Sequence, residues 1–328
     1  SGSGGLGRSL IGEALVEAIN QAVQHADSAR QYRVFTKEHD RIAVVPTAPD
    51  NDVRALLESG KDVVRRLRRG LTNALRSAEK RWWREDQLRG SLSPRTLHRL
   101  CMDRSGLDVF RTRCVVQGQS TAVSILLDAS GSMTTRKMEV ARSAMRVLLE
   151  ALADLKIAAE ALTFTTGNEV NTGQISQLSG QDAAKLRDRY ARLANLEIGL
   201  ICRFGEPVKA ALRRLPGVRG SGLTPLGEAM QIAAGRLIAR PENRRILLVL
   251  TDGKAGCEGC GEAAMNHARH VAGRIARAGI EPVGVGILDE SIREVVAESI
   301  VIHTLEDLPA QLCKLLGRAL QRGVRHVG

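Results

Sequence analysis

The chain has 328 residues, of which 43% are hydrophobic and only 2% aromatic. So few aromatic side chains leave almost no stacking platforms for single-stranded nucleic acid, which argues against an RNA-reading module. The formal net charge of +12 favours acidic partners in general, namely nucleic acid, a membrane surface or an acidic protein.

The sequence carries no signal for export or for membrane insertion. No apolar run approaches the ~18 residues that a spanning helix needs, and the Ser- and Gly-rich start at residues 1–5 does not resemble a signal peptide. The six cysteines are irregularly spaced, which is not typical of a secreted disulfide framework. We therefore expect a cytoplasmic protein in a reducing compartment, with no membrane partner.

Residues 1–118 show the periodicity of helices. Apolar residues recur at helical spacing in two stretches, and Pro46 and Pro49 break the chain between them. The first stripe is Leu10, Ile11, Ala14, Leu15, Ala18, Ile19 and Val23, and the second is Val53, Leu56, Leu57, Val64, Leu67, Leu71 and Leu75. Asp52 can cap the second stretch. We expect a smaller helical domain over residues 1–118.

Basic residues gather at the end of this region, and we interpret residues 61–84 as a basic helix. They are Arg65, Arg66, Arg68 and Arg69, followed by Arg76, Lys80, Arg81 and Arg84, with Trp82 and Trp83 between them. The simpler interpretation is a solvated face whose arginine stems lie along apolar surface. The alternative is a nucleic-acid-binding face, which would make the protein a nucleic-acid-associated factor.

After residue 118 the pattern alternates between strands and helices. Branched apolar runs predict strands near 114–116, 122–127, 158–164, 246–250 and 282–287, and helical spacing predicts helices near 137–155, 226–238, 262–278 and 308–320. This alternation predicts an α/β domain over residues 119–328, with a doubly wound, mostly parallel sheet flanked by helices. Ligands bind such sheets at the carboxyl ends of the strands.

Oxygen-bearing side chains follow two of these strands. Asp128, Ser130 and Ser132 form Asp-x-Ser-x-Ser directly after one strand, Asp252 follows another, and Thr224 precedes a helix. Five such side chains, with no Cys or His among them, suit Mg²⁺ or Mn²⁺, which prefer oxygen ligands in octahedral geometry. The three pieces occur in order, which is much less common than an isolated polar turn.

The same three pieces resemble the metal-ion-dependent adhesion site (MIDAS) of von Willebrand factor A (VWA) domains. The resemblance covers residues 119–320. It implies that Ser130, Ser132 and Thr224 touch the metal directly, and that Asp128 and Asp252 often act through water. An open coordination position on the metal would then accept an acidic residue of a partner.

Other strings resemble the carboxyl-terminal region of CobT, the VWA subunit of aerobic cobaltochelatase. They are Phe164–Gly167, Arg244–Leu248 and Gly279–Ile287, and the likeness extends upstream to Tyr32–Thr36. The resemblance implies a partnership with an AAA+ ATPase of the MoxR or CobS type and with a large client or chelatase subunit. No Walker-type Gly-x4-Gly-Lys-Ser/Thr loop occurs, so we expect a non-catalytic subunit of an ATP-dependent, cobaltochelatase-like complex.

A second candidate metal site lies just after the first one. Cys257, Cys260, His267 and His270 form Cys-x2-Cys followed by His-x2-His, which suggests Zn²⁺ and a zinc-binding regulatory module. The gap between the two pairs is shorter than in a usual zinc finger. The alternative hypothesis is a loop with two free thiols, followed by two histidines on one helix turn.

Overall fold

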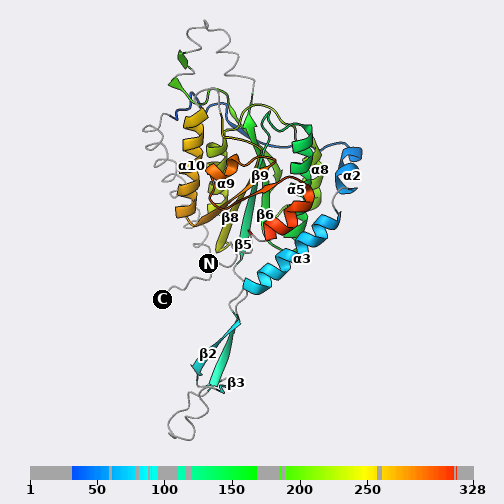
Figure 1. The fold of residues 1–328 in the computed structure, drawn as a ribbon, viewed down its shortest axis with the longest axis vertical. Helices are drawn as coiled ribbons and strands as arrows, with labels where there is room; N and C mark the ends of the chain where they lie inside the picture. The colour runs from blue at the N-terminus through cyan, green and yellow to red at the C-terminus, as the bar shows by residue number, and fades with distance from the viewer. Residues whose placement is uncertain are drawn as a thin grey trace, which may run out of the picture.

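A seven-stranded sheet forms the centre of the molecule in the computed structural model (Figure 1). The structure describes residues 32–58, 61–78, 81–87, 89, 91–94, 110–115, 120–167, 185–186, 189–256, 261–313 and 315. The expected helix around residues 10–23 lies outside these residues. Within them, no helix is both long and apolar enough to cross a membrane.

The strand order in the sheet is β1-β7-β6-β5-β8-β9-β10. The strands are β1 (Arg41–Val44), β5 (Thr121–Asp128), β6 (Ala158–Thr166), β7 (Leu196–Cys202), β8 (Arg244–Thr251), β9 (Ile280–Ile287) and β10 (Ser299–Ile302). Strands β6, β5, β8, β9 and β10 are parallel, whereas β7 runs antiparallel to β6, and β1 is parallel to β7. The expected doubly wound, mostly parallel sheet is therefore confirmed.

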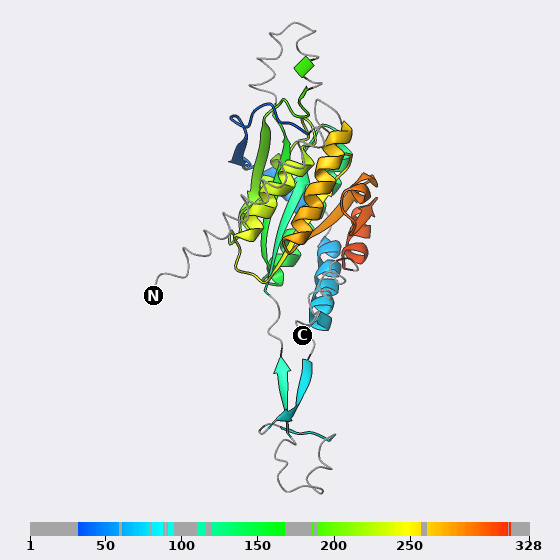
Figure 2. The ribbon, with the colours of Figure 1, turned by 90° about the vertical axis from the view of Figure 1, so that its left-hand side faces the viewer.

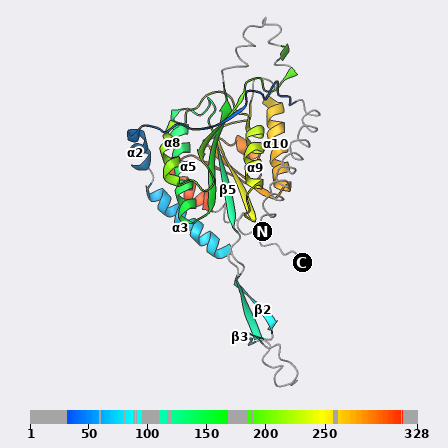
Figure 3. The same ribbon diagram turned by 180° about the vertical axis from the view of Figure 1, so that it is seen from behind.

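Helices cover both faces of the sheet, as Figure 3 shows from behind. Helices α9 (Leu226–Ile238) and α10 (Gly261–Arg277) lie on one face, and α5 (Thr135–Asp154), α8 (Val208–Arg214) and α3 (Lys61–Ala78) lie on the other. Side chains alternate along a strand, so β5 supplies Val123 and Ile125 to one core cluster and Ala122 and Leu126 to the other. Both faces are thus buried, which explains the nearly continuous apolar run of β5.

Three elements of the region after residue 119 were not expected from the sequence. Strand β7 and helix α8 lie between residues 164 and 226, where we predicted neither a strand nor a helix, and β10 forms the far edge of the sheet. Strand β7 contains Glu197 and Gly199, which interrupt its apolar pattern. Its pairing with both β6 and β1 determines its conformation more than its intrinsic propensity does.

The region before residue 118 contains strands as well as helices. Strand β1 joins the main sheet, and α2 (Asp50–Glu58) and α3 follow it. Helix α3 packs against α5 through Leu67 and Leu71, which are 0% and 2% exposed. Gly70 allows a close approach, since a Cβ there would lie 2.2 Å from Cys313 Sγ. The N-terminal part is therefore built into the α/β core.

The expected basic helix over residues 61–84 is wrong in its second half. Helix α3 ends at Ala78, and Arg81–Gln87 forms strand β2 in a three-stranded antiparallel sheet of order β2-β4-β3. The other members are β3 (Ser91–Leu92) and β4 (Phe110–Val115), so the strand predicted at 114–116 belongs to this small sheet. Aromatic residues favour strands, and the Trp82-Trp83 pair lies in the first half of β2. The small sheet extends away from the α/β body (Figure 2).

Candidate metal centre

The first part of the candidate site is the turn that follows β5. Asp128 is the last residue of this strand and is fully buried. The backbone N–H of Ser130 donates to Asp128 Oδ1 at 2.8 Å, which fixes the turn and orients the carboxylate. Ser130 is 1% exposed, so its hydroxyl also lies inside the protein. The Asp-x-Ser-x-Ser motif therefore begins at a buried strand end, as the sequence predicted.

Ser132 connects this turn to Asp252. The hydroxyls of Ser130 and Ser132 are 2.9 Å apart, and Ser132 Oγ donates to Asp252 Oδ1 at 2.8 Å. Asp252 directly follows β8, the parallel neighbour of β5, and is 2% exposed. Four of the five predicted ligands thus form one chain of hydrogen bonds at the carboxyl end of the sheet.

Thr224, the fifth predicted ligand, lies in a loop bound to the same turn. The N–H of Gly131 donates to Gly222 O at 2.9 Å, and the N–H of Ser221 donates to Ala129 O at 2.8 Å. Gly222 has a φ of +66°, and a Cβ there would lie 2.1 Å from Thr166 O. Only glycine fits this position without strain. In the described part of the chain, the Thr224 hydroxyl makes no hydrogen bond with the other four ligands.

Two further side chains touch the carboxylates, and our sequence analysis did not assign them to the site. Thr251 Oγ1 donates to Asp128 Oδ2 at 2.6 Å, and Lys137 Nζ lies 2.6 Å from Asp252 Oδ2. Thr251 is the last residue of β8 and lies beside Asp128 because β5 and β8 pair in parallel, with Leu127 opposite Leu250, so strand pairing rather than its position next to Asp252 brings it to the site. Lys137 gives no signal in the sequence, because it lies in the first turn of α5, far from Asp252 along the chain.

Burial raises the pKa of Asp128 to about 6. The hydrogen bonds from Thr251 and Ser130 oppose this shift, and the neighbouring charge of Asp252 adds to it. The site therefore holds a buried carboxylate whose charged form is unfavourable without a nearby cation.

The residues present fit a divalent cation. All their donor atoms are oxygens, which suits Mg²⁺ or Mn²⁺, and a cation beside Asp128 would favour its charged form. Within the described residues, no group of three or more His, Cys, Asp and Glu side chains can hold a metal. A metal site here therefore depends on the hydroxyls of serine and threonine.

A family model described as the VWA domain of the cobalamin biosynthesis protein CobT matches residues 109–322, more than half of the chain. The chain belongs to the CobT VWA domain family. The resemblance seen in the sequence is thereby confirmed, both for the VWA fold and for its CobT branch.

Several solved structures of low sequence identity are similar to this CobT VWA family member. The pilus adhesin SpaC from Lactobacillus rhamnosus GG is 10% identical over 63% of this chain and 31% of its own, with a TM-score of 0.42. The PilB minor pilin from Streptococcus sanguinis is 14% identical over 66% of both chains, with a TM-score of 0.44. The vWF domain of the pilus tip protein Mfa5 from Porphyromonas gingivalis is 8% identical over 63% of this chain and 97% of its own, with a TM-score of 0.43. The chain thus spans less than a third of SpaC and about two thirds of PilB.

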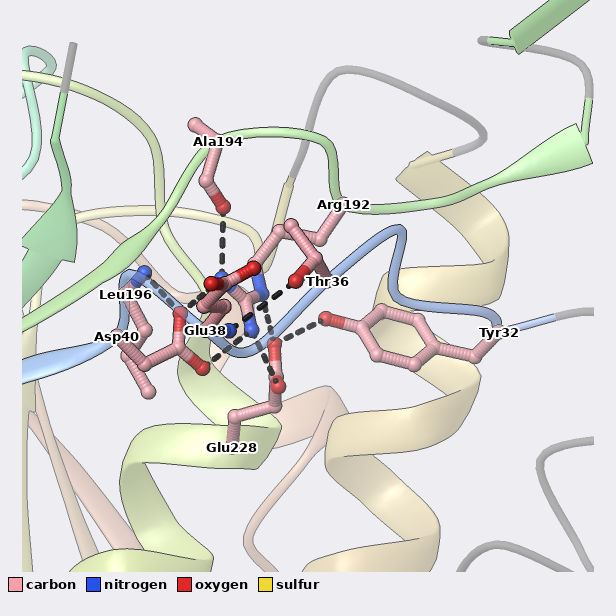
Figure 4. A network of polar contacts seen from close by, with 8 residues as sticks. All are labelled: Tyr32, Thr36, Glu38, Asp40, Arg192, Ala194, Leu196 and Glu228. Atoms are coloured by element: carbon pink, nitrogen blue, oxygen red, sulfur yellow. Dashed lines mark hydrogen bonds and ion pairs between the residues drawn. The ribbon is translucent and has the colours of Figure 1, made fainter. Parts of the chain in front are cut away.

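A second buried polar cluster of this CobT VWA domain lies at the start of α9, shortly after Thr224 (Figure 4). Arg192 is fully buried and pairs with two carboxylates. Its Nε and Nη2 donate to Glu228 at 2.6 and 3.0 Å, and its Nη1 and Nη2 donate to Asp40 at 2.8 Å each. Tyr32 Oη donates to Glu228 Oε2 at 3.0 Å. The hydrogen bonds of this cluster therefore hold residues 32–40 against the domain.

The histidines of the suggested zinc site lie on α10, while Cys257 and Cys260 lie outside the described residues. His267 is 2% exposed, and its ring stacks on that of Tyr32 with centroids 4.0 Å apart and an interplanar angle of 8°. Gly227 makes room for it, since a Cβ there would lie 2.3 Å from His267 Nδ1. His267 thus helps to hold the segment around Tyr32, which is a structural role.

Proposed function

We propose that this chain is a metal-dependent protein-interaction subunit that docks a partner through Mg²⁺, or Mn²⁺, held by Asp128, Ser130, Ser132, Thr224 and Asp252. The observation that carries the proposal is the hydrogen-bonded chain from Asp128 to Asp252 at the carboxyl end of β5 and β8. Two buried carboxylates and two serine hydroxyls from separate segments meet there.

The docking chemistry follows from the donor set. Three hydroxyls neutralise none of the charge of a divalent cation, so the bound cation keeps enough positive character to attract a further carboxylate. An Asp or Glu of a partner would complete the octahedron. Charge-assisted contacts of this kind are stronger than neutral hydrogen bonds, so binding of a partner should depend strongly on the metal.

We further propose an AAA+ ATPase of the MoxR or CobS type and a large client or chelatase subunit as the partners. Membership of the CobT VWA family supports this assignment. In such a cobaltochelatase-like complex the chain would be the non-catalytic adaptor, passing the motion of the ATPase to the client. The cytoplasm, where ATP is available, is the compartment that fits this role.

Affinity capture with variant baits tests the proposal. Wild-type, Asp128→Asn and Asp154→Asn proteins are used as baits in host lysate with Mg²⁺ and, separately, with EDTA. Asp154 is the matched control, because it is an exposed aspartate at the opposite end of α5. We expect the wild-type and Asp154→Asn baits to retain an ATPase and a large protein in Mg²⁺ alone, and Asp128→Asn to lose at least one of them.

Equal retention by all three baits, with or without EDTA, would overturn metal-dependent docking. Retention of nucleic acid alone, with a steep dependence on salt, would instead favour the alternative function through exposed arginines of α3.

A further inference from the structure

Lys137 is a positively charged residue placed inside the candidate metal site. It lies in the first turn of α5, and its ammonium group is 2.6 Å from Asp252 Oδ2. The Asp252 side chain is fully buried, whereas that of Lys137 is 28% exposed. The lysine therefore reaches from the surface to a buried carboxylate.

Lys137 contacts Oδ2 of Asp252, and Ser132 contacts the other oxygen. Ser132 Oγ already donates to Oδ1, so both oxygens accept hydrogen bonds from the protein itself. Lys137 thus neutralises Asp252, whereas Asp128 accepts from neutral donors, namely Ser130 and Thr251 Oγ1. The two carboxylates of the site differ in that one has a cation of its own.

A divalent cation and this ammonium group cannot share Asp252 without cost. Two like charges ~4 Å apart repel strongly at the effective dielectric constant of a partly buried site. Binding of the metal must therefore weaken or displace the contact of Lys137 with Asp252. Since the lysine is partly exposed, it can rotate toward solvent along its flexible stem.

We propose that Lys137 is a resident competitor for the metal, which neutralises Asp252 in the metal-free protein and lowers the affinity of the site for Mg²⁺. The inference rests on the proposed metal site and adds a residue that sets its affinity. Lys137 closes the site when the metal is absent. The metal-bound state, and with it docking of an acidic partner, then requires a higher concentration of free Mg²⁺.

The test is calorimetric titration of purified protein with MgCl2 and with MnCl2. Lys137→Met keeps the length and the apolar stem of the side chain and removes its charge, and Lys137→Arg keeps the charge. We expect Lys137→Met to bind Mg²⁺ about tenfold or more tightly than wild type, because a like charge next to the metal is removed. Lys137→Arg should bind no more tightly than wild type.

A second readout needs no metal. In EDTA, Lys137→Met should unfold at a lower temperature than wild type, because Asp252 is left buried without its cation. Saturating Mg²⁺ should raise its unfolding temperature more than that of wild type. Arg136→Gln is the matched control, since it removes one positive charge from the exposed side of the same helix turn. This substitution should change neither the unfolding temperature in EDTA nor its increase in Mg²⁺ appreciably, because exposed charges are screened.

The outcomes separate this inference from the metal site itself. If wild type binds Mg²⁺ and Lys137→Met binds it equally or more weakly, the lysine is not a competitor and the inference is overturned, while the metal site stands. If neither protein binds Mg²⁺ or Mn²⁺ at millimolar concentration, both the proposed site and the inference fall. Tighter binding by Lys137→Met supports both.

Discussion

The candidate metal centre and the Arg192 cluster each contain two carboxylates and one cation, but they share the cation differently. In the Arg192 cluster one guanidinium donates to both Asp40 and Glu228 through four hydrogen bonds. Burial acts to lower the pKa of Arg192, but the two carboxylates outweigh it and raise that pKa. In the metal centre, Lys137 contacts Asp252 alone, and burial raises the pKa of Asp128.

The difference separates a structural cluster from a binding site. The planar guanidinium of arginine matches two carboxylates at once, so that both carboxylates of the cluster accept charge-assisted hydrogen bonds. In the candidate metal centre the groups that donate to Asp128 are neutral, so a bound cation can stabilise the charged form of this carboxylate. Buried charge without an internal partner is a property expected of a functional site.

The largest effect should come from breaking the Arg192 cluster. Arg192→Met leaves the buried Glu228 and the partly exposed Asp40 without their cation, which should lower the free energy of unfolding by about 3–5 kcal/mol. Urea denaturation followed by circular dichroism measures this loss. A loss below about 1 kcal/mol would show that Arg192 does not balance these carboxylates, and would remove the contrast between the two clusters.

In metal-free protein, Asp128→Asn should raise the free energy of unfolding, whereas Arg192→Met should lower it. The folded-state pKa of Asp128 is raised from 3.8 to about 6, so its protonated form is favoured by folding. That contribution is complete below about pH 4, and it is lost as the pH rises through about 6. A shift of roughly two units corresponds to about 3 kcal/mol, so the variant should approach this gain in unfolding free energy near pH 7.

Urea denaturation in EDTA at several values between pH 4.5 and 7.5 checks this prediction. The difference between Asp128→Asn and wild type should grow as the pH rises, and Mg²⁺ should reverse its sign by stabilising only wild type. The exposed Asp154→Asn serves as control and should show no such trend. A difference that is constant over this pH range would mean that Asp128 ionises normally.

Tyr32→Phe should have a smaller effect, because it removes one hydrogen bond from the Arg192 cluster. Phenylalanine keeps the ring that stacks on His267 and loses the donor to Glu228 Oε2. We expect a loss of about 1 kcal/mol in the free energy of unfolding, the usual value for one buried hydrogen bond. Denaturation of the single variant and of a Tyr32→Phe/Arg192→Met double variant measures it. Strict additivity in the double variant would show that the two residues do not act as one cluster.

The smallest effect should come from exposed charge. Arg66→Gln and Arg69→Gln alter the solvated side of α3, and each should change the free energy of unfolding by less than about 0.5 kcal/mol. Mg²⁺ binding by these variants should equal that of wild type in calorimetric titration. A clear loss of Mg²⁺ affinity would show that these exposed charges of α3 act on the candidate metal centre at long range. The properties of that centre would then not be set by its local contacts alone.

Much of the α/β core could be predicted from the sequence. Strands such as β5 and helices such as α9 carry an apolar period that matches their burial, so most elements from residue 119 onward could be placed, although β7, α8 and β10 could not. Strand β1 could not be found in this way, because its four residues are all exposed. The helical interpretation of residues 81–87 failed because arginine periodicity carries no information about strand pairing.

The sequence by itself determined which oxygen-bearing side chains this protein offers at the candidate site and in which order, because Asp-x-Ser-x-Ser, Thr and Asp occupy strand ends and loops that local chemistry prescribes. Only the tertiary structure decided that Lys137 shares Asp252 with Ser132 and that Arg192 joins Asp40 to Glu228. The physical reason is separation along the chain. Contacts between residues more than a hundred positions apart depend on how the sheet is packed, and no local pattern records them.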